Sequence, residues 1–305
     1  MSRSYRYLHL DVFTAKPFAG NQLAVFLDGR GLAADEMQAI AKEMNFSEST
    51  FVLPAEEAGT DMRVRIFTPG EELPMAGHPT IGTAFALALA GSVDRSRERV
   101  VFGLGVGPTP VDLSWGDTAL AFAWMTQLPP TFGPPLDVAP VAAAALRLPA
   151  AAITNSRLPV QVVSCGVPYL IVPLESRAAV DAARLEAAAY EALVTETALG
   201  QVAIYLFTTE RGRGDSATAY SRMFAPSIGI GEDPATGSAA GPLGCYLVAH
   251  SVIDSANAAT IMNLQGVRMG RPSVIHMAIA SDGQAITRVR VGGEAVLAGE
   301  GTLYV

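Results

Sequence analysis

The sequence predicts an α/β protein built from two similar halves. Short apolar runs alternate with helix-like runs along the whole chain. An Arg-x-Phe-x-Pro pattern occurs at Arg65–Pro69 and again at Arg222–Pro226, about half a chain later. Each copy ends an expected strand and precedes a glycine-bearing turn and a helix rich in small residues. The repetition indicates an internal duplication, and we expect a ligand site between the halves.

In the first half, apolar runs bounded by turn residues predict the strands. They are expected at Tyr7–Phe13, Leu23–Leu27, Phe51–Leu53, Met62–Phe67, Val100–Phe102, Val111–Leu113 and Ala119–Trp124. An amphipathic helix is expected at Asp35–Met44, with Asp35 as its cap. A second helix is expected at Pro79–Ala90, because proline near the first helical position loses no hydrogen bond.

A proline-rich stretch from Leu128 is interpreted as the boundary between the halves. Strands of the second half are expected at Val160–Ser164, Tyr169–Val172, Val202–Phe207, Ala217–Phe224 and in the tail from Thr260 to Val305. Helical stretches are expected between Ala178 and Val194, and a further helix at Ser238–His250.

Composition excludes several classes of function. The 305 residues carry 21 Lys and Arg against 29 Asp and Glu, a formal charge of −8. This acidic balance predicts neither a nucleic-acid partner nor an anionic membrane surface. No apolar run is long enough for a spanning helix, and two cysteines make no disulfide framework, so a cytoplasmic protein is expected.

No cofactor or metal site is expected. The stretch Gly103-Leu-Gly-Val-Gly107 has the wrong spacing for a dinucleotide loop, and a proline follows it. None of the four histidines pairs with another His or Cys at ligand spacing. Cys165 and Cys245 stand at neither expected helix start, so both are interpreted as buried apolar residues rather than a racemase thiol pair.

The two expected helix starts are the first candidate for a site. One contains Gly77 and His78, and the other contains Asp233, Gly237 and Ser238. The unpaired N–H groups and positive dipole end of a helix favour an anion, and two such ends could hold a carboxylate. One such start alone would indicate only capping and close packing; its repetition favours the anion site.

Glu48 is the candidate acid–base group. It stands between an expected helix and an expected strand, where burial would raise the pKa of its carboxyl group toward a useful range. Taken alone, its position favours an ordinary surface glutamate at a helix–strand turn. His78 could donate to a substrate or bridge loops, and Asp233 could touch a substrate or cap its helix.

Five segments spread in order over most of the chain resemble the PhzF-like phenazine-biosynthesis family of the diaminopimelate epimerase-like superfamily. They are Asp11–Thr14 with Pro17–Phe26, then Ser47–Phe51, Arg65–Pro69, Ala76–Gly82 and Gly231–Gly241. Residues 126–200 and the tail carry no recognisable signature.

The resemblance implies an α+β fold of two pseudo-symmetric domains, each a curved, mostly antiparallel sheet around a central helix. The domains would cover residues 1–127, completed by a last strand at about 295–305, and residues 128–294. The family is associated with homodimers and with a proton shift that needs no cofactor. By resemblance, Glu48 moves the proton, His78 and Asp233 orient the substrate, and Gly77, Gly237 and Ser238 bind its polar groups.

The leading hypothesis is a cofactor-independent isomerase of a small anionic substrate, similar to trans-2,3-dihydro-3-hydroxyanthranilate isomerase. A racemase or epimerase of a small amino-acid-like acid stays open, as does a non-catalytic small-molecule-binding protein. The sequence does not identify the substrate or pathway.

Overall fold

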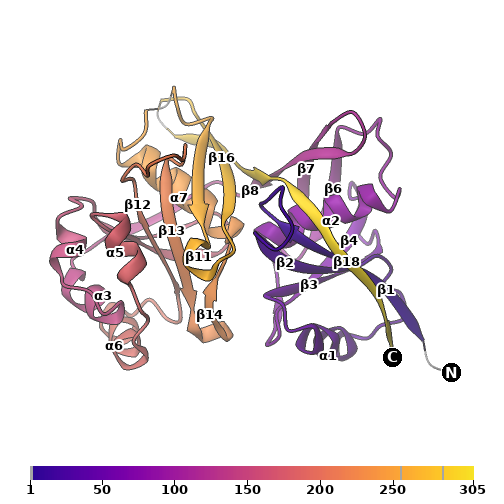
Figure 1. Cartoon of the computed structure of the whole chain (residues 1–305), viewed down its shortest axis with the longest axis horizontal. Helices are drawn as coiled ribbons and strands as arrows, with labels where there is room; N and C mark the ends of the chain where they lie inside the picture. Colours follow the sequence, from indigo (N-terminus) through magenta and orange to yellow (C-terminus); the bar gives the residue numbers. More distant parts are fainter. Residues whose placement is uncertain (1–2, 255, 284) are drawn as a thin grey trace. The chain divides into compact units, whose positions relative to one another are not determined.

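The computed structural model describes residues 3–254, 256–283 and 285–305. The chain divides into two compact units. Unit 1 contains Met1–Gln127 and Arg290–Val305, and unit 2 contains Leu128–Val289. Figure 1 shows both chain ends in unit 1, where the C-terminal strand lies beside the N-terminal one.

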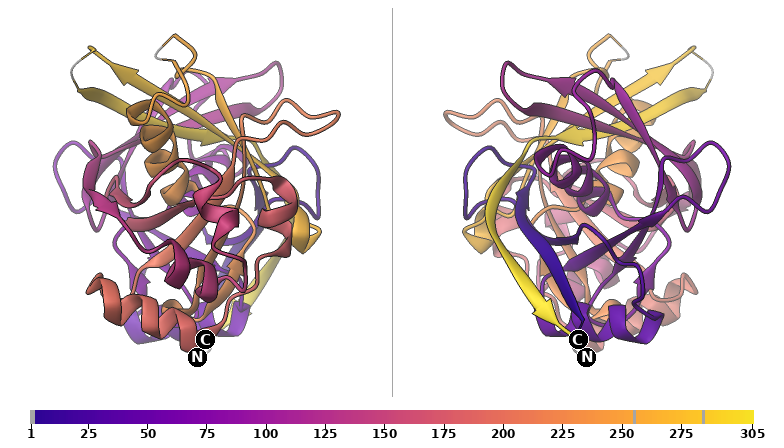
Figure 2. Two further views of the ribbon diagram at one scale, coloured as in Figure 1. Left: turned by 90° about the vertical axis from the view of Figure 1, so that its left-hand side faces the viewer. Right: turned by 90° about the vertical axis from the view of Figure 1, so that its right-hand side faces the viewer.

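The strands of unit 1 form a mixed, mostly antiparallel sheet. They are β1 (Ser4–Val12), β2 (Asn21–Phe26), β3 (Glu48–Pro54), β4 (Met62–Phe67), β5 (Glu72–Leu73), β6 (Arg99–Leu104), β7 (Gly107–Trp115), β8 (Leu120–Gln127) and β18 (Ala295–Tyr304). β2–β3 and β4–β6 pair in parallel, whereas β1–β2, β3–β4, β6–β7 and β7–β8 pair antiparallel. β8 pairs with β17 (Ile286–Gly293), which leads into β18, and β18 pairs with β1. The right-hand view of Figure 2 shows β18 beside β1.

Helix α2 (Gly77–Leu89) is the central helix of unit 1. It contacts β1, β2, β3, β7, β8 and β18, and every residue from Gly77 to Leu87 is buried. Small side chains permit this packing: a Cβ atom on Gly82 would lie 2.5 Å from the Leu23 side chain and 2.7 Å from that of Val12. Burying a large apolar side chain such as Ile81 contributes about 1.5–3 kcal/mol.

Helix α1 (Ala34–Met44) covers the other face of the sheet. Its buried residues Met37, Ile40 and Ala41 recur at helical spacing and pack with Phe51. The prediction that Asp35 caps this helix is wrong, because the N-cap is Ala33 and Asp35 lies inside the first turn. Glu36 reaches back instead and accepts from the Ala33 N–H at 2.8 Å.

Unit 2 repeats this plan. Its strands are β9 (Thr131–Leu136), β10 (Val160–Ser164), β11 (Pro168–Pro173), β12 (Ala203–Thr208), β13 (Ala219–Ala225), β14 (Ile230–Asp233), β15 (Ile261–Gln265), β16 (Ser273–Ser281) and the first half of β17. β11–β12 and β13–β15 pair in parallel, whereas β9–β10, β10–β11, β12–β13, β13–β14 and β15–β16 pair antiparallel. The central helix α7 (Gly237–Ala249) is buried from Gly237 to Leu247 and contacts β10, β11 and β16.

Four short helices cover the outer face of the sheet in unit 2. They are α3 (Ala139–Ala145), α4 (Ala151–Thr154), α5 (Arg177–Ala182) and α6 (Ala187–Thr197). They pack a second apolar core with Leu170, Ile204 and Phe224. Two short 3₁₀ turns, η1 (Pro226–Ile228) and η2 (Val267–Met269), complete the unit.

The proline-rich stretch that was interpreted as the boundary between the halves begins unit 2 at Leu128, and part of it is a strand. Residues Thr131–Leu136 form β9, which pairs with β10 and has no fully buried residue. Pro134 and Pro135 cannot donate to a ladder, but an edge strand tolerates them because one row of its N–H groups needs no partner.

Candidate active site

Glu48 is the first residue of β3, whereas the sequence placed it in a turn before the strand. It is only 7% exposed and lies opposite Leu23 in the parallel β2–β3 pair. Alternation along β3 puts Glu48 and Thr50 on the same face. Thr50 bonds Thr83 of α2 at 3.0 Å, so Glu48 also faces the central helix.

His78 meets Glu48 from α2. It is the second residue of the helix and 3% exposed, and its Nε2 lies 3.2 Å from Glu48 Oε2. Burial lowers the pKa of His78 to about 3, against a smaller opposing effect of a hydrogen bond with the Gln22 backbone. The positive end of the helix dipole also disfavours the imidazolium. A neutral imidazole therefore stands beside the carboxyl group, where the two can share one proton.

Asn21 and Ser47 hold the opposite edge of the imidazole. The side-chain amide of Asn21 lies 3.1 Å from His78 Nδ1, and the Ser47 hydroxyl donates to Asn21 Oδ1 at 3.2 Å. Asn21 is fully buried at the start of β2. The sequence analysis did not select either residue for the site, although both lie in quoted motifs. One feature of the sequence could have predicted Asn21 as a site residue: it follows a glycine in a turn and is the first residue of an apolar strand.

Asp233 occupies the corresponding region of unit 2. It is the last residue of β14 and 4% exposed. The Thr236 hydroxyl donates to its Oδ2, and Gln265 Nε2 donates to its backbone carbonyl at 2.9 Å. Gln265 also accepts from the Thr236 N–H at 3.1 Å. Gln265 stands in β15, within the tail where the sequence showed no signature.

The predicted binding residues stand at the two helix starts. Gly77 is the first residue of α2, and Gly237 is the first residue of α7. Neither N-cap residue supplies a side-chain cap to its helix. Ser238 follows Gly237 and shares a 2.7 Å hydrogen bond with the hydroxyl of Tyr169. The structure thus brings Glu48 and His78 together in unit 1, where Gly77 precedes His78 at the start of α2. It gathers Asp233, Gly237 and Ser238 around the start of α7 in unit 2.

The cysteines stand apart from the helix starts, as predicted. Cys165 and Cys245 are buried free thiols, with sulfur atoms 3.8 Å apart. Cys245 lies in the third turn of α7. Its pKa is raised, first by the hydrogen bond with Cys165 and then by burial.

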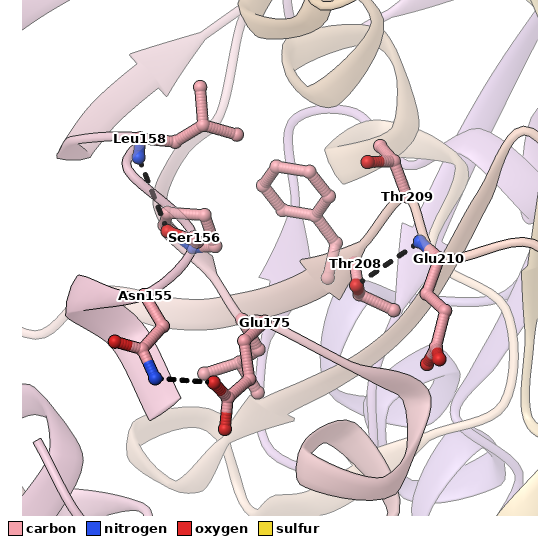
Figure 3. A pocket seen from close by; sticks show the side chains of 10 residues that line it. Asn155, Ser156, Leu158, Glu175, Thr208, Thr209 and Glu210 are labelled. Atoms are coloured by element: carbon pink, nitrogen blue, oxygen red, sulfur yellow. Dashed lines mark hydrogen bonds between the residues drawn. The ribbon is translucent and has the colours of Figure 1, made fainter. Parts of the chain in front are cut away.

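A separate cavity of about 370 Å³ lies in unit 2, at the carboxyl ends of the parallel strands β11 and β12 (Figure 3). Asn155 donates to Glu175 at 2.7 Å on one side, and the Glu210 N–H donates to Thr208 on the other. Its lining contains none of the six predicted site residues.

Within the described residues, no group of three or more His, Cys, Asp and Glu is placed to hold a metal ion. No helix in the same part of the chain is sufficiently long and apolar to cross a membrane.

Comparison with solved structures supports the predicted fold. A PhzF-family phenazine biosynthesis protein of Bacillus anthracis superposes with a TM-score of 0.87 at 25% identity, covering 99% of this chain and 100% of that one. A predicted epimerase of Pseudomonas aeruginosa gives 0.81 at 32% identity, covering 98% and 99%. A hydroxyproline epimerase of Agrobacterium vitis gives 0.66 at 13% identity, covering 99% and 93%, and shares the fold alone. The predicted epimerase-like α+β fold is confirmed.

Comparison of sequences identifies the family. The model of the PhzC–PhzF phenazine biosynthesis-like proteins matches residues 10–301. The trans-2,3-dihydro-3-hydroxyanthranilate isomerase of Pseudomonas aeruginosa is 36% identical over 304 residues, which cover 99% of this chain and 100% of that protein. An uncharacterized isomerase of Mesorhizobium japonicum is 38% identical, over 98% of each chain. With a family model that covers nearly the whole chain and full-length relatives above 30% identity, this protein belongs to the PhzC–PhzF family, as its five motifs predicted.

Proposed function

We propose that this isomerase moves a proton between two carbons of a small anionic substrate, with Glu48 as the acid–base group. The observation that carries the proposal is the 3.2 Å contact between Glu48 Oε2 and a buried His78. Membership of an isomerase family and the isomerase names of full-length relatives support the reaction class.

The proposed reaction needs one base that becomes one acid. The Glu48 carboxylate removes a proton from a carbon next to an unsaturated or carbonyl group, and the electron pair of the broken C–H bond moves into the adjacent π system. The double bond shifts, and the protonated Glu48 returns the proton to another carbon. His78, held neutral by burial, lies 3.2 Å from Glu48, where we propose that it exchanges the proton with the carboxyl group within the site.

The substrate class follows from the relatives and from the helix starts. The Pseudomonas aeruginosa relative is named for trans-2,3-dihydro-3-hydroxyanthranilate, so we propose a small cyclic or amino-acid-like acid. The first amides of α2 and α7, at Gly77 and Gly237, are proposed to bind its anionic group, since helix N-termini favour negative charge. Ser238 and Asp233 are proposed to orient polar groups of the substrate.

We further propose that both helix starts bind one substrate, and that the enzyme works without a cofactor as a cytoplasmic homodimer. We also propose that it has neither a nucleic-acid nor a membrane partner, on the basis of its acidic charge.

Exchange of substrate hydrogen with solvent tests the proposed chemistry. Small cyclic and amino-acid-like acids are incubated in heavy water with the wild type or Glu48→Gln. We expect the wild type to move a double bond and exchange hydrogen, and Glu48→Gln to lose about 10²–10⁴-fold in kcat while it still binds. Wild-type turnover that persists in Glu48→Gln would contradict the role of Glu48.

An epimerase is the second candidate, favoured by the structural likeness to a predicted epimerase at 32% identity. The same incubation separates the two reactions. Epimerisation inverts a carbon centre and leaves the bonds in place, whereas isomerisation moves the double bond. A pure binding protein would show neither product with any acid that it binds.

A further inference from the structure

The carboxamide of Gln265 can take only one orientation. Its Oε1 accepts from the Thr236 N–H at 3.1 Å and from the Tyr205 hydroxyl at 2.9 Å. Its Nε2 donates to the Asp233 carbonyl and to Thr236 Oγ1, both at 2.9 Å. A backbone N–H can only donate and a backbone carbonyl can only accept, so exchanging the oxygen and nitrogen would break both backbone contacts. Gln265 is fully buried, which makes that exchange costly.

The orientation of Gln265 determines where the Thr236 proton points. Thr236 Oγ1 accepts from Gln265, so its single hydrogen is left for another acceptor. That acceptor is Oδ2 of Asp233. Thr236 and Asp233 are 5% and 4% exposed, so solvent competes little for these bonds. Gln265 thereby holds Oδ2 of Asp233 as an acceptor through the hydroxyl of Thr236.

Helix capping does not explain the threonine. A threonine at an N-cap normally accepts from an amide of the first turn. Thr236 is the N-cap of α7, yet its side chain makes no such bond. The N-cap of α2 is Ala76, which has no hydroxyl at all, and that helix still forms with a buried first turn. The start of a central helix in this fold therefore does not need the hydroxyl.

We propose that Thr236 and Gln265 are positioning residues that fix the side-chain orientation of Asp233 for catalysis. This inference rests on the proposed function, because it gives Asp233 a substrate-orienting role. Thr236 directs a proton at the carboxylate, and Gln265 fixes the direction of that proton. Neither residue touches the reacting atoms in this proposal.

A pair of substitutions at Thr236 gives the sharpest test. Thr236→Val keeps the shape of the side chain and removes the hydroxyl, whereas Thr236→Ser keeps the hydroxyl. We expect Thr236→Val to lower kcat about 10- to 100-fold with little change in KM, because a misdirected catalytic group costs about this much. Thr236→Ser should stay close to the wild type. Equal losses in the two variants, or full kcat in Thr236→Val, would overturn the proposal.

Thr208→Val is the matched control for loss of a buried hydroxyl. Thr208 is 3% exposed in the same unit, and its Oγ1 accepts from the Glu210 N–H at 3.3 Å. We expect this variant to keep the wild-type kcat. If Thr208→Val loses as much kcat as Thr236→Val, the effect is a general response of unit 2 to lost hydroxyls, and the proposal is wrong.

Gln265→Met tests the other positioning residue, and crystal structures supply a readout that needs no turnover. A thioether at position 265 cannot donate to Thr236, so we expect the same fall in kcat as for Thr236→Val. The Asp233 side chain should rotate in Thr236→Val and keep its place in Thr236→Ser. An unchanged Asp233 in Thr236→Val overturns the inference even if no substrate is found. Absence of turnover in the wild type, with the expected rotation of Asp233, counts against the proposed function alone.

Discussion

The two units share one scaffold and differ in the residues that stand on it. Strands β1 to β4 of unit 1 and β10 to β13 of unit 2 pair in the same order, antiparallel, then parallel, then antiparallel, with the parallel pair at β2–β3 and at β11–β12. Those two parallel ladders open with Leu23 opposite Glu48 and with Tyr169 opposite Ala203. The position that carries the proposed base in unit 1 therefore carries a methyl group in unit 2. Duplication preserved the pairing pattern, and single side chains made the halves chemically different.

The helix starts show the same contrast. His78 is the second residue of α2, and Ser238 is the second residue of α7. The preceding N-cap is Ala76 in one unit and Thr236 in the other. Unit 1 thus offers an imidazole beside a carboxyl group, whereas unit 2 offers hydroxyls around a carboxylate. The fold explains where these groups stand, and their chemistry has to be argued from the side chains.

A paired arginine and glutamate recur in both units. Arg65 binds Glu72 with two hydrogen bonds of 2.8 and 2.6 Å, and Arg222 binds Glu232 with two of 2.8 Å. Each guanidinium also lies over the phenylalanine two residues later, 5.0 Å away at Phe67 and 4.9 Å at Phe224.

Burial separates the two arginines. The side chain of Arg222 is 5% exposed, against 21% for Arg65. Arg222 also donates to the carbonyls of Val180 and Ala183 at the end of α5, at 2.9 and 2.8 Å. These bonds satisfy carbonyls that the helix leaves without partners. Arg222 therefore joins α5 to the sheet in addition to binding its glutamate.

The largest effect on stability is expected from Arg222→Ala. Removing one partner of a buried pair leaves Glu232 and the Val180 carbonyl without the donor that Arg222 supplies, which costs about 3–5 kcal/mol of unfolding free energy. The Ala183 carbonyl still accepts from Arg184. Urea unfolding followed by circular dichroism measures the loss. The double variant Arg222→Ala/Glu232→Ala should recover part of it, because it removes the stranded carboxylate. A loss below about 1 kcal/mol would mean that the buried arrangement contributes no more than a surface pair.

The second-largest expected effect is a pH dependence of the unfolding free energy, which should arise at the helix start of unit 1 and not at that of unit 2. The pKa of His78 is lowered from 6.5 to about 3 by burial, so the unfolded chain binds a proton there that the folded chain does not. The neutral His78 therefore contributes fully to the unfolding free energy above pH 6.5, and this contribution is lost as the pH falls from about 6 toward 3. Its slope is about 1.4 kcal/mol per pH unit for one proton.

His78→Gln removes this titration, and the carboxylates common to both proteins cancel in the difference. Unfolding free energies of the wild type and His78→Gln, measured at four pH values between 7 and 4, give two slopes. We expect the wild type to lose stability faster on acidification. Parallel slopes would show that His78 is protonated as easily in the folded protein as in the unfolded one.

Local patterns predicted the strands, the central helices and the repeat, because each depends on residues that are close in sequence. The sequence motifs identified Glu48 and His78 as candidates, but they did not predict that the two side chains are in contact. Gln265 escaped prediction because it meets Asp233 and Thr236 only through β15, far along the sequence. The strand at Thr131–Leu136 escaped for a related reason, since only its edge position makes its prolines tolerable.

The smallest effect, and the one that completes the comparison, is expected from Arg65→Ala. Its pair with Glu72 is partly exposed, and partly exposed ion pairs contribute about 0.2–1 kcal/mol. The loss of unfolding free energy should stay near the top of that range, because the pair is bidentate and the guanidinium lies over Phe67.

Half-molar sodium chloride should reduce the difference between wild type and variant, since salt screens exposed charges. The effect of Arg222→Ala should persist in the same salt, because buried charges are screened far less. A salt-independent loss of several kcal/mol in Arg65→Ala would show that the two arginines act alike, and burial would then not be what separates the halves.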